Sequence, residues 1–190
     1  MNITRHPPAH EASPPPDAAL VLRLRAGDVQ ALGALYQRYG GAVRSVLLRV
    51  EPTMTHEDAA DLCHEAFLTF RDTLDRYEHR DQLRSWLFGI ALRKARAARR
   101  RRGWRHALRV QGASQAAGVS LYQGDDEARV DARRRIDRLL GALPEAQREV
   151  LVLHAIEGLS VQETAATLGL SDNAVSTRLY RERRALKEAR

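Results

Sequence analysis

One stretch of this chain decides how it folds: residues 160–179 read SVQETAATLGLSDNAVSTRL. The Ser160 hydroxyl can cap a helix, and Glu163 can accept a hydrogen bond from the exposed backbone amide of Ser160, a reciprocal arrangement typical of helix starts. Gly169 tolerates the positive φ of a tight turn, and Ser171 can cap the next helix. The pattern therefore predicts two short helices joined by a turn, which is a helix-turn-helix.

The second helix of this motif has a buried side and a polar side. Val175 and Leu179 are four residues apart and return to the core. In a helix-turn-helix the second helix enters the DNA major groove, where Asn and Arg can bond base edges and Ser or Thr can reach bases or phosphates. The alternative is an ordinary helical hairpin with a solvated basic face. We expect contacts to double-stranded DNA from Ser171, Asn173, Ser176, Thr177, Arg178, Arg181 and Arg184.

Charge is distributed unevenly along the 190 residues, which carry a formal net charge of +7. Residues 84–109 contain ten Lys or Arg and no acid, whereas residues 51–81 contain nine Asp or Glu against three Arg. A net basic chain suggests a polyanionic partner, and two neighbouring segments of opposite sign suggest two different partners. A basic run alone is often only a solvated face.

The location of the protein is indicated by what the sequence lacks. Cys63 is the single cysteine, so no internal disulfide can form and a reducing compartment is expected. No apolar run approaches the roughly 20 residues that cross a bilayer, and the Pro-rich start lacks the apolar segment of a signal peptide. We therefore expect a cytoplasmic protein that is not inserted in a membrane.

Apolar periodicity indicates an all-α protein made of two small helical domains. Residues 1–16 are Pro-rich and are expected to be disordered; residues 17–109 form the first domain, with a buried stripe of Ala59, Leu62, Ala66, Phe70 and Leu74. Residues 110–128 contain Gly, Ala and Ser without basic residues and are expected to form a flexible linker. Residues 129–190 form a second domain that ends in the helix-turn-helix.

Three sequence blocks in the first domain and one in the second carry a resemblance to a known family. The blocks are ALYQRY at 34–39, DAADLCHEAF at 58–67, LRSWLFGIA at 83–91 and LPEAQREV at 143–150, followed by the helix-turn-helix. In this order, the chain over residues 20–188 resembles an extracytoplasmic-function sigma factor of bacterial RNA polymerase, which keeps only sigma regions 2 and 4. The resemblance implies a protein that binds core polymerase, directs promoter-specific initiation and helps to melt promoter DNA, with no enzymatic activity and no cofactor or metal of its own.

The resemblance also assigns surfaces. The acidic helix would dock on core polymerase through Asp58, Asp61, Leu62, Glu65 and Phe67. The basic part would hold the melted minus-ten element through Tyr77, His79, Gln82, Arg84, Arg93, Lys94 and Arg96, because single-stranded bases need stacking partners and phosphates need cations. Trp86 shares a helical stripe with Leu83, Leu87 and Ile90, and we expect it in the core. The second domain would read the minus-thirty-five element, and an anti-sigma protein is a further possible partner.

Two other classes of protein remain as alternatives. A free-standing helix-turn-helix regulator would explain the DNA-binding motif, but it would not need an acidic helix beside a basic one. An enzyme acting on DNA would need clustered carboxylates or metal ligands. The histidines and Cys63 lack zinc-type spacing, and the acids lie on what reads as an exposed helical face.

Overall fold

The structure is a computed structural model that describes residues 15–78, 82–108 and 127–188. These residues form helices and short connections with no strand, so the expected all-α fold is confirmed. The expected disordered tail, apart from Pro15 and Pro16, lies outside the described residues, and so does the expected linker up to residue 126. Side chains are described for residues 15–78, 82–101 and 135–181.

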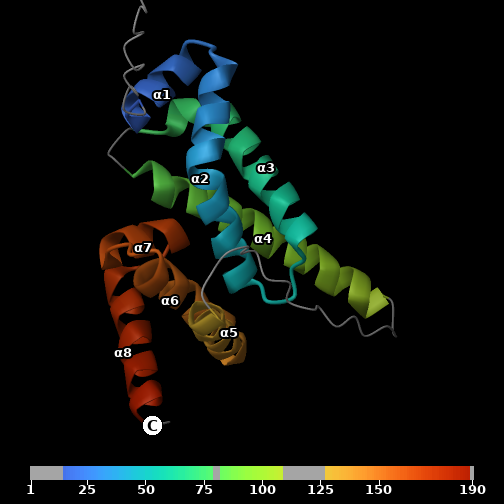
Figure 1. Cartoon of the computed structure of the whole chain (residues 1–190), viewed down its shortest axis with the longest axis vertical. Coiled ribbons are helices and arrows are strands. Elements are labelled where there is room, and N and C mark those ends of the chain that lie inside the picture. Colours follow the sequence, from blue (N-terminus) through green and yellow to red (C-terminus); the bar gives the residue numbers. More distant parts are fainter. Residues whose placement is uncertain (1–14, 79–81, 109–126, 189–190) are drawn as a thin grey trace, which may run out of the picture.

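The first half of the chain folds into four helices that pack around one core (Figure 1). They are α1 (Asp17–Arg25), α2 (Val29–Val50), α3 (His56–Asp72) and α4 (Leu83–Leu108), with a 3₁₀ turn at Leu74–Arg76. Gly27 at φ 89° and the Asp28 cap, which accepts from Gln30 N–H at 3.0 Å, separate α1 from α2. The chain therefore breaks between α1 and α2 at Gly27 and Asp28.

The buried stripe of α3 is the centre of this first core. Its five expected members, Ala59, Leu62, Ala66, Phe70 and Leu74, are each at most 8% exposed. At its start, Thr55 and Asp58 form a capping box in which Asp58 N–H donates to Thr55 Oγ1 at 3.0 Å. Burial of each large apolar side chain contributes roughly 1.5–3 kcal/mol to the stability of the fold. The buried stripe therefore holds one side of α3 against the core, and the opposite side remains accessible to a partner.

The second half contains α5 (Glu127–Ala142), α6 (Glu145–Leu151), a π-helical turn over Val152–Ile156, α7 (Val161–Leu168) and α8 (Asp172–Glu188). Pro144 stands at the N-cap of α6, as expected for a residue without a free N–H. Gly158 at φ 72° ends the segment that follows α6. Val150 and Leu153 are fully buried in the core of this half.

The two sets of helices contact each other. Helix α7 packs against α4, and α5 and α6 pack against α2 (Figure 1). Thr167 of α7 lies over the N-terminal part of α4, where its hydroxyl is 3.4 Å from the carbonyl oxygen of Ser85. Among the described helices, none combines the length and the apolar character that a membrane span requires.

Candidate nucleic-acid interface

The helix-turn-helix has the local geometry that its sequence predicts. Ser160 N–H donates to Glu163 Oε2 at 2.8 Å, and Glu163 N–H donates to Ser160 Oγ at 3.1 Å. Gly169 ends α7 in the left-handed conformation, at φ 69° and ψ 39°. Ser171 Oγ accepts a hydrogen bond from Ala174 N–H at 3.2 Å, at the start of α8. The capping box, the glycine turn and the second cap are therefore confirmed.

Helix α8 presents a polar face to solvent. Val175 and Leu179 are 0% and 8% exposed and attach the helix to the core, as expected. Arg178 is half-buried, and its guanidinium donates to the carbonyl of Ala146 at 3.3 Å, so it also holds α8 against α6. The side chain of Arg184 lies outside the described residues. The expected DNA-facing residues that are exposed are Ser171, Asn173, Ser176, Thr177 and Arg181.

Helix α4 also carries basic side chains that DNA could contact. We call Arg84, Arg93, Lys94, Arg96 and Arg99 the basic face of α4. Arg93 is exposed, whereas Lys94 lies 3.2 Å from Glu65 of α3. Arg84 and Arg96 form ion pairs with Glu157 and Glu149 of the C-terminal helices. Arg96 donates hydrogen bonds to the Glu149 carboxylate, and these bonds raise the pKa of Arg96 above its ordinary value.

Two aromatic residues near this surface differ in burial from what the sequence predicts. Tyr77 is only 1% exposed and packs edge-on against Phe70 and Trp86, with ring centroids 5.6 Å apart in both pairs. Trp86 is 36% exposed, so its expected burial in the core is wrong. In this structure Trp86, and not Tyr77, offers an accessible ring next to the basic face of α4.

The remaining minus-ten candidates are in the segment between Tyr77 and α4. Gln82 is exposed, and its carbonyl accepts hydrogen bonds from Ser85 Oγ at 2.9 Å and Trp86 N–H at 3.0 Å. His79 lies outside the described residues. Arg25 of α1 donates to the carbonyls of Leu74 and Tyr77, which fixes the segment just before His79.

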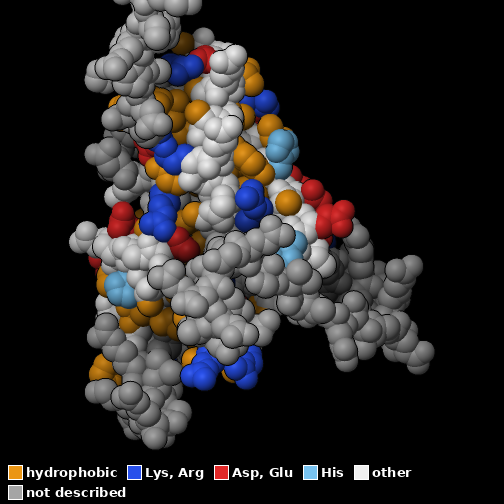
Figure 2. Space-filling view, viewed as in Figure 1, with side chains coloured by type: hydrophobic (Ala, Val, Ile, Leu, Met, Phe, Trp, Pro, Cys, Tyr) orange, Lys and Arg blue, Asp and Glu red, His pale blue; other side chains and the backbone are white. Residues whose placement is uncertain are grey.

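The acidic surface lies on α3. Figure 2 shows acidic side chains gathered over this helix, away from the C-terminal helices. Asp61 and Glu65 are exposed, and Asp58 is partly exposed within its capping box. Leu62 and Phe67 are 8% and 2% exposed, and Phe67 packs edge-on against Tyr36 at 5.0 Å. The side chains accessible to a partner are therefore the carboxylates, while Leu62 and Phe67 belong to the core.

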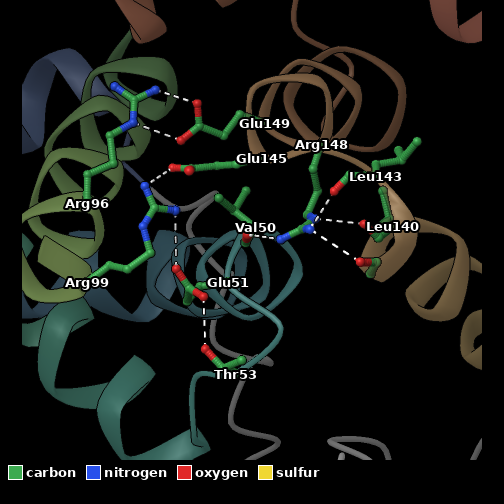
Figure 3. Close-up of polar contacts among 11 residues, drawn as sticks. Val50, Glu51, Thr53, Arg96, Arg99, Leu140, Leu143, Glu145, Arg148 and Glu149 are labelled. Carbon is green, nitrogen blue, oxygen red and sulfur yellow. Dashed lines mark hydrogen bonds and ion pairs between the residues drawn. The ribbon is translucent and has the colours of Figure 1, made fainter. Parts of the chain in front are cut away.

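Sequence reasoning missed the contacts that join the two halves of the protein. Arg148 of α6 donates to Val50 O at the end of α2 at 2.9 Å, and to Leu140 O and Leu143 O at 2.7 and 2.6 Å (Figure 3). A guanidinium is favourable at the carbonyl end of a helix, because that end carries partial negative charge. Residues far apart in the sequence make these contacts, and no local pattern marks them. In the described part of the chain, no group of three potential metal ligands lies together.

The fold and surfaces define a class: an all-α protein with a helix-turn-helix, a second basic helix and an acidic helix. Comparison with known proteins defines the family. The family model for Sigma-70 region 2 matches residues 35–105, and the model for Sigma-70 region 4 matches residues 133–186. The chain belongs to the extracytoplasmic-function sigma factors, and it is an RNA polymerase sigma factor.

Named relatives span nearly the whole chain. RNA polymerase sigma factor CnrH of Cupriavidus metallidurans is 35% identical over 89% of this chain and 92% of its own length. RNA polymerase sigma factor NccH of Alcaligenes xylosoxydans xylosoxydans is 32% identical over 90% and 92%. The ECF RNA polymerase sigma-E factor of Escherichia coli K12 is 28% identical over 90% and 92%.

Solved structures show the same fold. The structure of CnrH in complex with the cytosolic domain of CnrY matches with a TM-score of 0.64 and 31% identity, covering 91% of this chain and 97% of that one. The sigma factor RpoE in complex with the anti-sigma factor NepR from Bartonella quintana matches with a TM-score of 0.62 and 25% identity, covering 78% and 89%. Both similar chains were solved with a protein partner bound.

Proposed function

We propose that this sigma factor divides its work among three surfaces. The carboxylates of Asp58, Asp61 and Glu65 on α3 bind core RNA polymerase, the basic face of α4 with Trp86 holds the melted minus-ten strand, and the polar face of α8 reads the minus-thirty-five element. The observation that carries this proposal is the distribution of exposed charge: Asp61 and Glu65 are exposed on α3, whereas Arg93 is exposed on α4 and Arg181 is exposed on α8.

Each surface suits its proposed partner. Complementary charge steers protein encounters and fixes the register of the two partners. Stacking on an aromatic ring contributes about 1–3 kcal/mol per unpaired base, and the neighbouring arginines neutralise phosphates. Trp86 has the exposed ring that stacking needs, while the buried Tyr77 positions Trp86 through their edge contact. We therefore assign Trp86, rather than Tyr77, to the unpaired strand.

On α8, the exposed Asn173 and Arg181 are the side chains with the donor patterns that read purine edges in the major groove. Ser176 and Thr177 are suited to phosphates or bases. Two DNA-reading domains in one chain, with the boundaries 17–109 and 129–190 that the sequence predicts, would make the second contact intramolecular and raise avidity.

Further parts of the proposal concern partners and location. We propose that the protein is an initiation factor without catalysis of its own and acts in the cytoplasm, where promoter DNA is found. Its similarity to CnrH and RpoE, which were solved with CnrY and an anti-sigma factor, supports an anti-sigma partner for this chain as well.

Charge reversal on α3 tests the polymerase surface. The Asp61→Lys/Glu65→Lys protein should remain folded but should lose core polymerase in a pull-down, because repulsion replaces attraction. A matched control is Asp72→Lys/Asp75→Lys, which makes the same charge change at exposed positions outside the proposed surface. Normal capture of polymerase by the folded Asp61→Lys/Glu65→Lys protein would remove the assignment of α3.

A further inference from the structure

Arg25, the last residue of α1, reaches the backbone of a turn that is distant in the sequence. Its Nη2 donates to Leu74 O at 3.3 Å and also to Tyr77 O. These carbonyls are 49 and 52 residues further along the chain, at the two ends of the 3₁₀ turn that follows α3. Helix α1 packs on α2, so Arg25 ties this pair of helices to the turn.

The two carbonyls are suited to a guanidinium. The last carbonyls of a helical segment have no donor within that segment, and they carry partial negative charge. Tyr77 has φ −83° and ψ 107°, so the backbone leaves the helical conformation at this residue. A terminal nitrogen of Arg carries two N–H groups and can donate to both oxygens. Arg25 therefore fixes the place at which the backbone leaves the turn.

The side chain of Tyr77 transmits this fixed position to Trp86. The Tyr77 ring packs edge-on against both Phe70 and Trp86, with interplanar angles of 74° and 64°. Edge contacts of this kind are a preferred geometry of aromatic pairs. Phe70 is fully buried in the stripe of α3, whereas Trp86 is partly exposed. Tyr77 therefore connects the core to the exposed indole.

A partly exposed indole needs such a support if it is to meet a base in one orientation. The backbone of Trp86 is held in α4, where its N–H donates to Gln82 O at 3.0 Å, but this bond does not restrict the side-chain torsions. The contact with the Tyr77 ring restricts them. A ring that is already ordered loses less freedom on binding, so this preorganisation strengthens stacking without adding a contact.

We infer that Arg25 is a positioning residue for promoter melting: it holds the Tyr77 backbone, and the Tyr77 ring in turn keeps Trp86 oriented to stack on an unpaired base. This inference rests on the proposed use of Trp86 at the minus-ten element. Arg25 lies on α1, outside the residues that we assign to DNA or to polymerase, so its effect on melting passes through Tyr77 and Trp86.

A double-mutant cycle in the holoenzyme tests this series of contacts. Arg25→Met keeps the apolar stem and removes the donors, and Trp86→Ala removes the ring. The rate of open-complex formation is measured by permanganate reactivity, with core polymerase and a promoter that this protein directs. Arg25→Met should slow opening about fivefold in the wild-type background and less than about 1.5-fold in the Trp86→Ala background, because residues that act through one contact are not additive.

Arg23→Met is the matched control. It removes the same charge from the same helix, but the Arg23 guanidinium pairs locally with Asp28 at 2.7 Å. It should leave the opening rate within about 1.5-fold of wild type, because an exposed ion pair contributes little to the fold. Arg25→Lys should restore at least about half of the wild-type rate, since Lys is also favourable at the carbonyl end of a helical turn. Equal slowing by Arg23→Met and Arg25→Met, or equal slowing by Arg25→Met in both backgrounds, would overturn the inference.

Fluorescence of Trp86 gives a second readout that does not depend on DNA. Trp104→Phe leaves Trp86 as the only tryptophan of the chain. In this background Arg25→Met should raise the acrylamide quenching constant of the free protein and lower the fluorescence anisotropy of the indole, because the ring loses its support. Arg23→Met should change neither quantity, and circular dichroism checks that each variant is folded. Unchanged quenching and anisotropy in the folded Arg25→Met protein would contradict the positioning role.

The two measurements distinguish the inference from the proposed function. If Trp86→Ala slowed opening but Arg25→Met did not, the inference alone would fail. If Trp86→Ala opened promoters as fast as wild type, the proposed role of Trp86 would fail and the link to melting would fail with it, while the fluorescence comparison would still decide whether Arg25 orients the indole.

Discussion

The turn of the helix-turn-helix offers a quantitative test at Gly169. This residue has φ 69° and ψ 39°, and a Cβ atom added to it would meet nothing within 4 Å. Gly169→Ala therefore introduces no clash, and its whole cost is conformational. A left-handed conformation costs an L-residue about 1–2 kcal/mol, and the stiffer unfolded chain returns about half of this, so we expect a net loss near 1 kcal/mol.

Gly33 is the matched control for this substitution. It lies inside α2, also with nothing within 4 Å of an added Cβ, but in ordinary helical conformation. Gly33→Ala should therefore stabilise the protein by about 0.8 kcal/mol, because Ala is the better helix former. Gly169→Asn should lose less than Gly169→Ala, since Asn adopts the left-handed conformation more readily.

Thermal and urea unfolding followed by circular dichroism measure these changes. For a chain of this length, 1 kcal/mol corresponds to roughly 2–4 °C in Tm. The two alanine variants should shift Tm in opposite directions. If Gly169→Ala stabilised the protein as Gly33→Ala does, the left-handed turn would be absent, and the helix-turn-helix geometry described above would be incorrect.

Three further predictions concern single side chains. Arg181→Ala should weaken duplex binding, measured by anisotropy, and should reduce the slope of log affinity against log salt concentration by about 0.9. Arg178→Ala should in addition lower Tm, because the Arg178 guanidinium donates to Ala146 O. An unchanged salt slope for Arg181→Ala would mean that Arg181 faces away from DNA. Trp86→Ala should slow promoter opening, measured by permanganate reactivity, with little loss of stability, whereas Tyr77→Ala should cost about 3–5 kcal/mol of unfolding free energy; the opposite ranking would return Tyr77 to the DNA surface. Hydrogen bonds from the Ser160 backbone and hydroxyl lower the pKa of Glu163 from its ordinary 4.5. The stability advantage of wild type over Glu163→Gln should therefore be full at neutral pH and should be lost as pH falls from 4.5 through this lowered pKa; an advantage that grew toward low pH would contradict the capping box.

Local sequence patterns predicted local structure well. The capping box at Ser160, the turn at Gly169 and the cap at Ser171 depend on residues within a few positions of one another, and the structure confirms all three. The buried stripe of α3 was predictable for the same reason, because helical periodicity alone specifies which residues share a face.

Positions that depend on neighbouring helices were not predictable in this way. Trp86 lies on the same stripe as Leu83 and Leu87, yet it is at the edge of the core and 36% exposed, because the buried ring of Tyr77 takes the space beneath it. Periodicity specifies a face of a helix, but it does not specify where the neighbouring helices end.

The contacts between the two halves lay furthest beyond sequence reasoning. Arg84 and Glu157 are 73 residues apart, and Arg96 and Glu149 are 53 apart. Each residue taken alone reads as an ordinary surface charge. Only the packing of the C-terminal helices on the first half brings the arginines expected to bind DNA onto carboxylates of the same chain.

The most direct test of the central claim is transcription in vitro with purified core RNA polymerase, with and without this protein, on a library of promoter fragments. We predict start sites that appear only when the protein is present, each preceded by shared minus-ten and minus-thirty-five elements. Binding of duplex DNA without polymerase association and without new start sites would contradict the assignment as a sigma factor acting through these surfaces.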